Sequence, residues 1–414
     1  MTFSPQRPLL RLDRHGYSPA ALHLLAEAAG RLQSFADAAF AARLAGVDIS
    51  PRHLGRLVHE IGDEMAKRRD EKVIQRRRRQ LPARVATPPE VVAVEVDGGR
   101  LKTRAAGCGP GVHEAESKED KVACLVSLRS DHHEQDPKPE PPASFLEPRR
   151  VQRLVRQIKG LPGEHAAAAE PEDGAEPPCP AAKAPPVTES PTPLVRTCVA
   201  SMHEARLFGP MVAAEAQERA FSQAQRRAFL GDGLAYNWSI HKGYFPDFVP
   251  IVDLLHVLCY LYLAAWATGG AAAGRWSLYL AWLRACWQGR VSEVIQDLHV
   301  WQGRLGAPPE GEELKEFDPR RLVAEALRYL QNNQQRMDYP RYRQEGLPIT
   351  SSLVESLVGE FNARVKGPQK FWNRVEGAGA ETVLQIRAAV LSEDDRLERH
   401  LAERPGSPYR RKAG

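Results

Sequence analysis

The chain has 414 residues, with 57 Lys and Arg against 52 Asp and Glu, and a formal net charge of +5 at pH 7. This length allows two or three domains with large cores, and the mild basicity permits a nucleic-acid partner without requiring one. The six cysteines form no Cys-x-x-Cys pair, which argues against a zinc ribbon or a thioredoxin-like site and favours reduced thiols. Because the first residues contain no apolar core, we expect no secretory signal peptide.

Residues 19–80 are predicted to be helical, because 20–31 and 35–45 have helical apolar spacing. A turn at 46–50 precedes Pro51, which opens a further helix with Ser50 as its N-cap. Two helices joined by a short turn are typical of a helix-turn-helix, so residues 1–85 are predicted to bind DNA; the alternative is a helical hairpin with a solvated basic face. The predicted DNA contacts are Arg52, Arg56, Arg76, Arg77, Arg78 and Arg79.

In residues 91–104 (VVAVEVDGGRLKTR), apolar and β-branched residues lead to Asp97, which is followed by Gly98 and Gly99. The pattern predicts a buried strand that ends at Asp97 and a tight turn through the two glycines. A carboxylate at the end of a central strand lies where α/β folds place their chemistry. The alternative is a turn acid in a hairpin, because Asp-Gly is a common hairpin turn.

The following segments predict the rest of a first core region over residues 86–160. A Gly- and Glu-rich loop at 107–120 leads into a strand at 121–129, antiparallel to the first, and 151–159 forms a short amphipathic helix. Residues 161–193 are rich in Pro, Ala and Glu, and we expect a disordered insertion there.

A second core region is predicted over residues 194–256. It contains a strand at 195–202, a helix at 204–221, a strand at 226–230 ending in Gly231-Asp232-Gly233, a helix at 238–244 and a strand at 248–253. Three antiparallel strands followed by two parallel strands, separated by helices, are the order of an RNase H-like core. The predicted fold class is therefore α/β, with an RNase H-like mixed sheet preceded by a helical N-terminal domain.

Residues 257–345 are predicted to form an all-helical insertion, because nothing between 254 and 339 has a strand pattern. We expect its tryptophans in the core; the alternative is a platform for stacking bases. The uncharged residues 257–274 are predicted to be a buried helix, although their length raises the alternative of a membrane span. Final core helices are expected at 346–395 and a basic tail at 396–414.

Residues 350–367 carry two stripes at helical spacing. The apolar stripe consists of Val354, Val358, Phe361 and Val365. The polar stripe, one residue over, consists of Glu355, Gly359, Asn362 and Lys366. This second face could let a phosphate backbone approach beside a metal-bound acid. The alternative is a capping box in which Glu355, three residues after Ser352, only satisfies backbone donors.

Asp97, Asp232 and Glu355 thus occupy places that converge in an RNase H-like fold. Clustered carboxylates are costly to keep ionised, and Mg²⁺ or Mn²⁺, which prefer oxygen ligands, would relieve that cost. Two ions about 4 Å apart can serve an in-line displacement at phosphorus. The predicted reaction is phosphodiester hydrolysis or transesterification onto a 3′-hydroxyl.

The motifs VEVDGGR, LGDGLAYNW, FVPIVDLLH, LPITSSLVESLVGEFNARVKGPQKFW and GAGAETVLQIRAAVLS together resemble bacterial insertion-sequence transposases of the DDE type, specifically the Kra-type group. The resemblance covers residues 91–394 outside the Pro-rich insertion. It implies an enzyme that binds terminal inverted repeats, nicks the element ends and joins the 3′-hydroxyl to target DNA with Mg²⁺. By motif, the catalytic, metal-binding triad would be Asp97, Asp232 and Glu355. A homodimer or higher assembly on DNA in the bacterial cytoplasm, associated with the nucleoid, would follow.

Supporting roles are expected for Asp253, His256, Asn362, Lys366 and Trp238. Asp253 and His256 match an acid-x-x-His motif of related transposases. A rival interpretation makes Asp253 the second metal ligand; Asp232 is favoured because Gly231 and Gly233 would leave room for phosphate and metal. Trp238 and Trp372 could each stack on a base or pack in the core. Two functional alternatives remain: a metal-dependent nuclease of the same fold without strand transfer, and a non-catalytic DNA-binding protein derived from a transposase.

Overall fold

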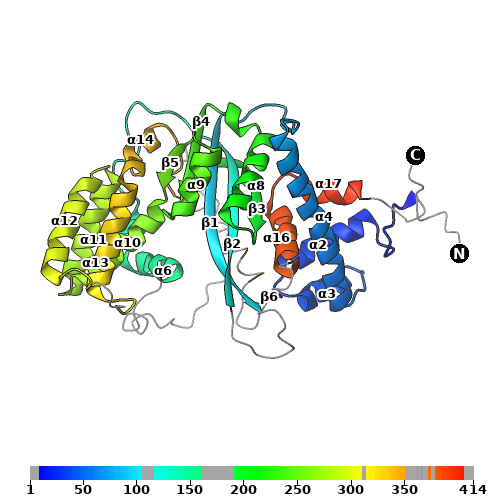
Figure 1. Ribbon diagram of the computed structural model, residues 1–414, viewed down its shortest axis with the longest axis horizontal. Coiled ribbons are helices and arrows are strands. Elements are labelled where there is room, and N and C mark those ends of the chain that lie inside the picture. The colour runs from blue at the N-terminus through cyan, green and yellow to red at the C-terminus, as the bar shows by residue number, and fades with distance from the viewer. Residues whose placement is uncertain are drawn as a thin grey trace.

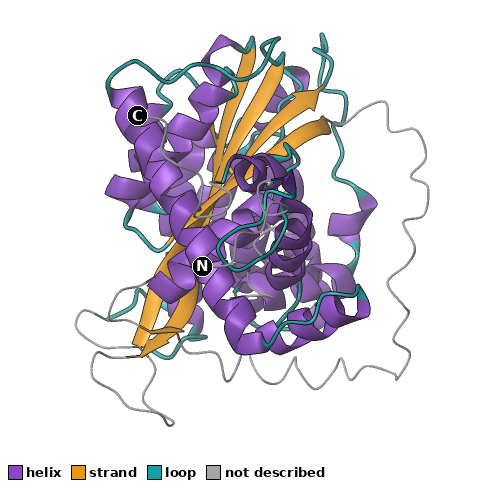
Figure 2. Ribbon diagram, turned by 90° about the vertical axis from the view of Figure 1, so that its right-hand side faces the viewer, coloured by secondary structure: helices purple, strands orange, loops and turns teal. Residues whose placement is uncertain are grey.

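The computed structural model describes residues 9–104, 116–159, 191–309, 314–350, 361, 365, 372–373 and 378–404. It is a mixed α/β structure around one twisted sheet (Figures 1 and 2). The strands are β1 (Val91–Arg104), β2 (Glu116–Arg129), β3 (Thr192–Ser201), β4 (Arg226–Gly231), β5 (Val249–Val252) and β6 (Trp372–Asn373). Their order is β3-β2-β1-β4-β5, with β6 beside the far end of β1.

The pairing directions divide the sheet into two parts. β2 runs antiparallel to both β1 and β3, whereas β4 runs parallel to both β1 and β5. The predicted order of three antiparallel strands followed by two parallel strands is confirmed. Helix α8 (Ala205–Glu218) connects β3 to β4, which are separated in the sheet by β2 and β1. Helix α9 (Ala235–Tyr244) connects the parallel neighbours β4 and β5, since such neighbours require a crossover.

The two faces of the sheet belong to two cores, because successive strand side chains point to opposite sides. Val92, Val94 and Val96 pack in one core with residues of α8 and α9. Val91 and Ala93 belong to the other core, with residues of the N-terminal, insertion and C-terminal helices. Figure 2 shows helices on both sides of the sheet. By this alternation, Asp97 belongs to the same face as Val91 and Ala93.

The helical segment after β5 lies at one end of the molecule (Figure 1). Its helices are α10 (Leu254–Ala267), α11 (Ala272–Trp287), α12 (Val291–Leu305), α13 (Pro319–Asn333) and α14 (Tyr339–Gln344), with a 3₁₀ turn at Gln334–Arg336. Trp282 and Trp287 are buried, as core positions require. α10 has buried residues around most of its circumference, which confirms the predicted buried helix as far as Ala267. Its predicted extent to residue 274 is wrong, because Gly269 and Gly270 have positive φ and residues 269–274 are exposed. No helix in the described ranges is long and apolar enough to cross a membrane.

The N-terminal helices share a core with the C-terminal ones. Helices α2 (Pro19–Arg31), α3 (Phe35–Leu44) and α4 (Pro51–Arg77) begin after the N-caps Ser18, Ser34 and Ser50, and the Ser50 cap was predicted. α4 packs along α16 (Ala378–Leu391), and α17 (Arg396–Glu403) ends the described chain. The approach is close: a Cβ on Gly62 would lie 2.3 Å from the carbonyl oxygen of Thr382.

Between β2 and β3 lie α5 (Ala143–Leu146) and α6 (Pro148–Ile158), the second of which was predicted as an amphipathic helix. A 3₁₀ turn at Phe221–Gln223 follows α8. The predicted disordered insertion falls largely on residues 160–190, outside the described part. Its predicted end at 193 is wrong, because β3 already begins at Thr192.

The predicted turn after Asp97 is also wrong. β1 continues through Gly98 and Gly99 to Arg104, and Asp97 pairs with Val122 of β2. β2 begins at Glu116, inside the segment predicted as a loop. The reason is tertiary: β2 supplies a continuous partner for the β1 backbone, and glycines are tolerated in a strand that is paired. The connection between the two strands falls in residues 105–115, which are not described.

Candidate active site

Three acids directly follow the last residues that pair in the parallel half of the sheet. Val96 of β1 is in register with Gly231 of β4, and Gly231 with Val252 of β5. Asp97, Asp232 and Asp253 are the next residues along each strand. Because neighbouring strands lie about 4.8 Å apart, the register alone brings these three residues to one edge of the parallel half of the sheet. This edge is where carboxyl ends of strands place ligand sites in α/β sheets.

Asp97 lies where β1 loses β4 as its partner but keeps β2. One of its carboxylate oxygens accepts a hydrogen bond from the Gly98 amide at 2.7 Å. Burial raises the pKa of Asp97 to about 6, and the negative charges of Asp232 and Asp253 add to this rise, while the charge of His256 opposes it. The charges of the neighbouring acids thus add to the effect of burial on Asp97.

Asp232 is held by the start of α9. Its Oδ1 accepts hydrogen bonds from the Leu234 amide at 2.9 Å and from Asn237 Nδ2 at 2.7 Å. Burial raises its pKa, as does the charge of Asp253, whereas His256 and Lys159 lower it. Within the described residues, its second oxygen accepts no hydrogen bond from protein. That oxygen remains available to a ligand.

The two glycines beside Asp232 do not leave the room that the sequence suggested. A Cβ on Gly231 would lie 3.1 Å from Asn237, and one on Gly233 would lie 2.5 Å from the Tyr329 ring. Gly233 also has a positive φ of +96°, which glycine adopts freely. These glycines are explained by close side-chain packing and backbone conformation, so the reason given for favouring Asp232 is wrong.

Exposure and bonding separate Asp253 from the other two acids. Its side chain is 1% exposed, and both oxygens are engaged: one caps α10 at the Leu255 amide, 3.2 Å away, and the other is 2.7 Å from His256 Nδ1. Burial opposes the charge on His256, but this hydrogen bond and the three carboxylates raise its pKa to about 9. Asp253 therefore orients and charges His256, which agrees with a supporting role.

Glu355, Asn362 and Lys366 lie outside the described residues. Two residues of the same predicted helix are described, Phe361 and Val365, and both are buried in the core that contains Val91 and Ala93 of β1. Trp372 donates from Nε1 to the carbonyl oxygen of Val365 at 2.8 Å. Phe361 and Val365 thus pack on the sheet face to which Asp97 belongs.

Trp238 is engaged with protein. Its Nε1 donates to Asn333 Oδ1 at 3.2 Å, and the guanidinium of Arg336 lies 4.4 Å from its ring centroid. Its ring also lies near Phe229. These contacts agree with the packing alternative for this side chain.

Sequence reasoning did not single out several side chains at the site. The Tyr329 hydroxyl donates to the carbonyl oxygen of Asp232 at 2.8 Å, and Asn237 fixes the Asp232 carboxylate. The Tyr236 hydroxyl would lie 3.0 Å from a Cβ on Gly98, and burial and the nearby acids raise its pKa. Tyr236 and Asn237 stand in the quoted motif LGDGLAYNW, but Tyr329 is almost 100 residues away and gave no signal.

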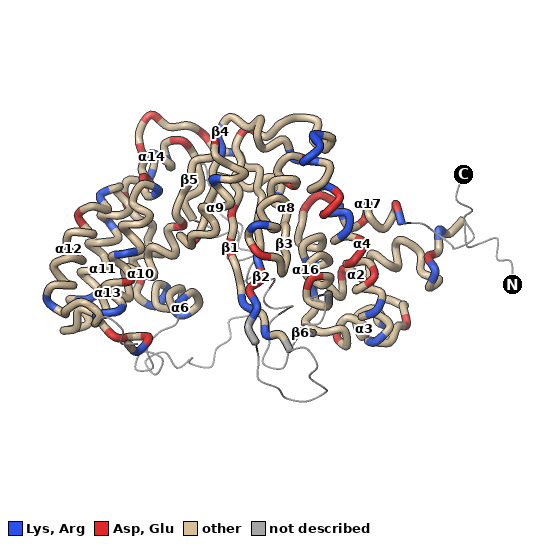
Figure 3. Tube along the Cα trace, viewed as in Figure 1, with Lys and Arg blue, Asp and Glu red and all other residues tan. Residues whose placement is uncertain are grey.

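The arginines predicted to contact DNA lie in α4 and directly after it. Arg52, Arg56 and Arg77–Arg79 are exposed, while Arg76 lies 5.9 Å from the Tyr244 ring. The neighbouring cations form ion pairs with other elements: Arg68 with Glu403, Arg69 with Glu381 and Lys72 with Glu218. Figure 3 shows acids and bases mixed along this helix. The predicted contact arginines that are exposed therefore lie in two groups, Arg52 and Arg56 near the start of α4 and Arg77–Arg79 at and just after its end.

The four cysteines of the described chain, Cys124, Cys198, Cys259 and Cys286, are free and buried. Among the residues with described positions, no group of three or more His, Cys, Asp or Glu side chains is arranged to hold a metal ion. Asp97 and Asp232 supply two carboxylates, and the third predicted ligand, Glu355, is not among those residues. No protein-family model matches the chain, and no curated protein matches its sequence.

Proposed function

We propose that this protein is a DNA transposase with an RNase H-like catalytic core, which binds the ends of a mobile element and catalyses metal-dependent cleavage and strand transfer. The observation that carries the proposal is the register at the sheet edge. Asp97 and Asp232 directly follow the paired residues Val96 and Gly231, so two acids separated by more than a hundred residues adjoin. The strand order and the motif resemblance support the same conclusion.

The donor set suits Mg²⁺ or Mn²⁺. Asp97 and Asp232 offer carboxylate oxygens, which these hard cations prefer. One oxygen of each carboxylate accepts hydrogen bonds from the protein, which fixes its orientation. Burial is the main reason that the pKa values of Asp97 and Asp232 are raised, and a bound cation would favour their ionised forms. Asp97, Asp232 and Glu355 would hold the ions, which would stabilise charge on the attacking and leaving oxygens of a phosphodiester.

The chain's own residues have distinct roles in this proposal. Gly98, Leu234 and Asn237 orient the two carboxylates by hydrogen bonds. Asp253 holds His256 protonated near neutral pH, because the pKa of His256 is about 9. A protonated imidazole beside two carboxylates is suited to bind a phosphate oxygen of the DNA strand. Tyr329 fixes the backbone of Asp232, so the loop after β4 keeps its position.

The test is a cleavage and strand-transfer assay with DNA carrying the element ends and Mg²⁺. Asp97→Asn, Asp232→Asn and Glu355→Gln should each abolish cleavage while leaving DNA binding nearly intact. Wild-type cleavage by one of these variants would remove that residue from the triad. A pre-cleaved end separates the alternatives: joining to target DNA supports a transposase, cutting without joining supports a nuclease, and neither activity supports a non-catalytic DNA-binding protein.

A further inference from the structure

Helix α6 presents a row of arginines to solvent. Its sequence PRRVQRLVRQI contains four arginines and no acid. Arg149 and Arg153 are one helical turn apart, on one face with Arg156, and Arg150 lies beside them. Arg149, Arg150 and Arg153 are exposed, and within the described part of the chain they form no ion pair. This contrasts with α4, where Arg68, Arg69 and Lys72 face acids.

The opposite face anchors α6 to the helical insertion. Val151 and Val155 are buried, and the helix packs against α10. Because apolar residues at this spacing occupy one side of α6, the arginines lie on its other sides. The packing of Val151 and Val155 therefore fixes which side of α6 carries the arginines.

The end of α6 is connected to the candidate active site by direct contacts. Lys159 donates from Nζ to the Tyr260 hydroxyl at 3.0 Å. The Tyr260 ring stacks on Tyr329 with centroids 4.0 Å apart, and the Tyr329 hydroxyl donates to the Asp232 carbonyl oxygen. The positive charge of Lys159 also acts on the Asp232 carboxylate. Three side chains thus join the basic helix to a predicted metal ligand.

A cleft runs beside the arginines. Its volume is about 760 Å³, and its lining includes Arg149, Arg150 and Arg153 together with Leu255 of α10. Leu255 lies two residues after Asp253 and donates its amide to that carboxylate. The cleft therefore extends from the arginine face to the start of the helix that carries His256.

We propose that the arginine face of α6 binds the phosphate backbone of the DNA that enters the active site. This inference rests on the proposed function, and it adds a DNA-binding surface distinct from α4. Guanidinium groups suit phosphate oxygens through paired N–H donors. A row of cations on the helix that Lys159 links to Asp232 through Tyr260 and Tyr329 would hold the backbone where the acids alone would repel it. The contact is with phosphates, so it is independent of base sequence.

The experiment compares three full-length variants with the wild type. In the first, Arg149, Arg150 and Arg153 are each replaced by Gln, and in the second each is replaced by Lys. The matched control replaces three exposed cations on other helices, Lys242, Arg304 and Arg328, by Gln. Affinity for a fluorescently labelled duplex of mixed sequence is measured over a salt series without divalent metal, and circular dichroism verifies folding.

The Gln variant should reduce the slope of log affinity against log salt by about one for each arginine that meets a phosphate. The Lys variant should keep the slope, because counterion release depends on charge, and the control should change it less than the Gln variant. An unchanged slope in the Gln variant, or an equal loss in the control, would overturn the assignment. So would binding to anionic lipid vesicles that exceeds binding to DNA.

The readout distinguishes this inference from the proposed function, because it requires no cleavage. If the slope falls as expected but the wild type cuts no DNA, the α6 surface stands and the transposase proposal fails. If the wild type cleaves and joins DNA while the slope is unchanged by the Gln variant, the proposed function stands and the α6 assignment fails.

Discussion

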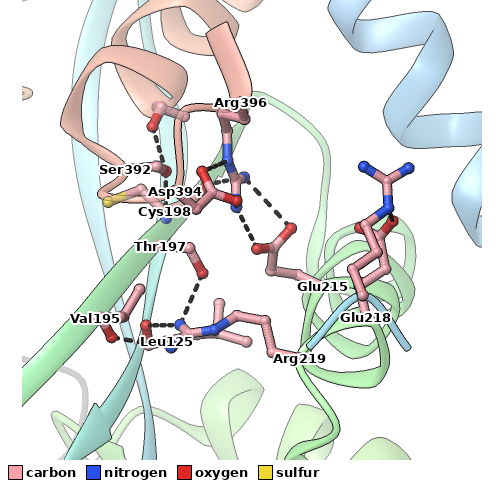
Figure 4. Close-up of polar contacts among 12 residues, drawn as sticks. Leu125, Val195, Thr197, Cys198, Glu215, Glu218, Arg219, Ser392, Asp394 and Arg396 are labelled. Carbon is pink, nitrogen blue, oxygen red and sulfur yellow. Dashed lines mark hydrogen bonds and ion pairs between the residues drawn. The ribbon is translucent and has the colours of Figure 1, made fainter. Parts of the chain in front are cut away.

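Two buried clusters of charged residues differ in the direction in which the pKa values of their carboxyl groups are shifted. In the first, Glu215 of α8 forms ion pairs with Arg396, which also pairs with Asp394 at 2.7 Å (Figure 4). In the second, the three acids Asp97, Asp232 and Asp253 share the positive charge of His256, with that of Lys159 also acting on Asp232. Burial raises the pKa of an isolated carboxyl in either place. Only the first cluster supplies enough positive charge to reverse that effect.

The first cluster is balanced. Burial alone would raise the pKa of Glu215, but the charges of Arg396 and Lys72 lower it, and Arg396 likewise lowers the pKa of Asp394. Arg219, one turn after Glu215, donates to the carbonyl oxygens of Leu125 and Val195 and to the hydroxyl of Thr197. Figure 4 shows these bonds joining α8 to β2 and β3. The cluster connects α8, the sheet and the C-terminal segment.

The second cluster has an excess of negative charge. The pKa values of Asp97 and Asp232 are raised, so the folded protein pays for keeping these carboxylates ionised. This difference fits a stabilising role for the first cluster, where arginines compensate the acids, and a functional role for the second, where they do not. The unbalanced cluster is where an exogenous cation would be most stabilising.

The largest expected effect comes from removing a negative charge from the second cluster, by replacing Asp97. Asp97→Asn should lower the cleavage rate by roughly 10⁴-fold, in the range seen when catalytic residues are removed. It should leave thermal stability unchanged or raised, because a repelled charge is removed. Asp247→Asn, at an exposed acid just before β5, is the control and should retain activity. A loss of stability in Asp97→Asn would mean that Asp97 is a structural acid.

The converse change breaks the balanced cluster. Arg396→Gln leaves Glu215 and Asp394 without their main cation and should lower the free energy of unfolding by about 3 kcal/mol, as for other buried ion pairs that lose one partner. Arg399→Gln is the matched control, because Arg399 pairs with Asp394 at 3.3 Å but its side chain is 48% exposed. Urea unfolding of both variants gives the difference, and equal stabilities would contradict the importance of the buried pair.

Divalent metal should act on one cluster only. Mg²⁺ that binds the folded state would stabilise it by about 2.7 kcal/mol at roughly 100 times its dissociation constant. We expect the melting temperature of the wild type to rise with Mg²⁺ and to return when the metal is chelated. Asp232→Asn should lose most of this rise, whereas Arg399→Gln should keep it. The same rise in the Asp232 variant would place the metal elsewhere.

The smallest effect concerns Glu64 of α4, which is partly exposed and forms ion pairs with His400 of α17 and with Arg404 directly after α17. Burial acts to raise the pKa of Glu64, but His400 and Arg404 lower it from 4.5 to about 2. A lowered carboxyl pKa contributes stability above about pH 4.5 that is lost as the pH falls toward 2. Because the side chain is 34% exposed, we expect only about 1 kcal/mol. Glu64→Gln should flatten the pH dependence of unfolding in this range; identical curves would contradict the prediction.

Local patterns predicted most of the elements. The apolar spacing of residues 20–31 and 35–45 gave helices, and Ser50 with Pro51 gave the start of α4, because caps and periodicity act within a few residues. The strands around Asp97 and Asp232 were identifiable for the same reason. The turn at Gly98 was not, because whether two glycines bend or extend depended on β2, a partner that local sequence does not reveal.

The sequence by itself determined where most helices and strands form and that Asp232 directly follows a strand, since these follow from short-range periodicity and turn chemistry. Only the tertiary structure decided which charges meet. It placed Asp97 beside Asp232 through strand register, gave Arg396 to Glu215 across 181 positions, and paired Arg69 and Lys72 of α4 with distant acids. Electrostatic partners are chosen by packing across long loops, and a linear pattern of charges does not specify that choice.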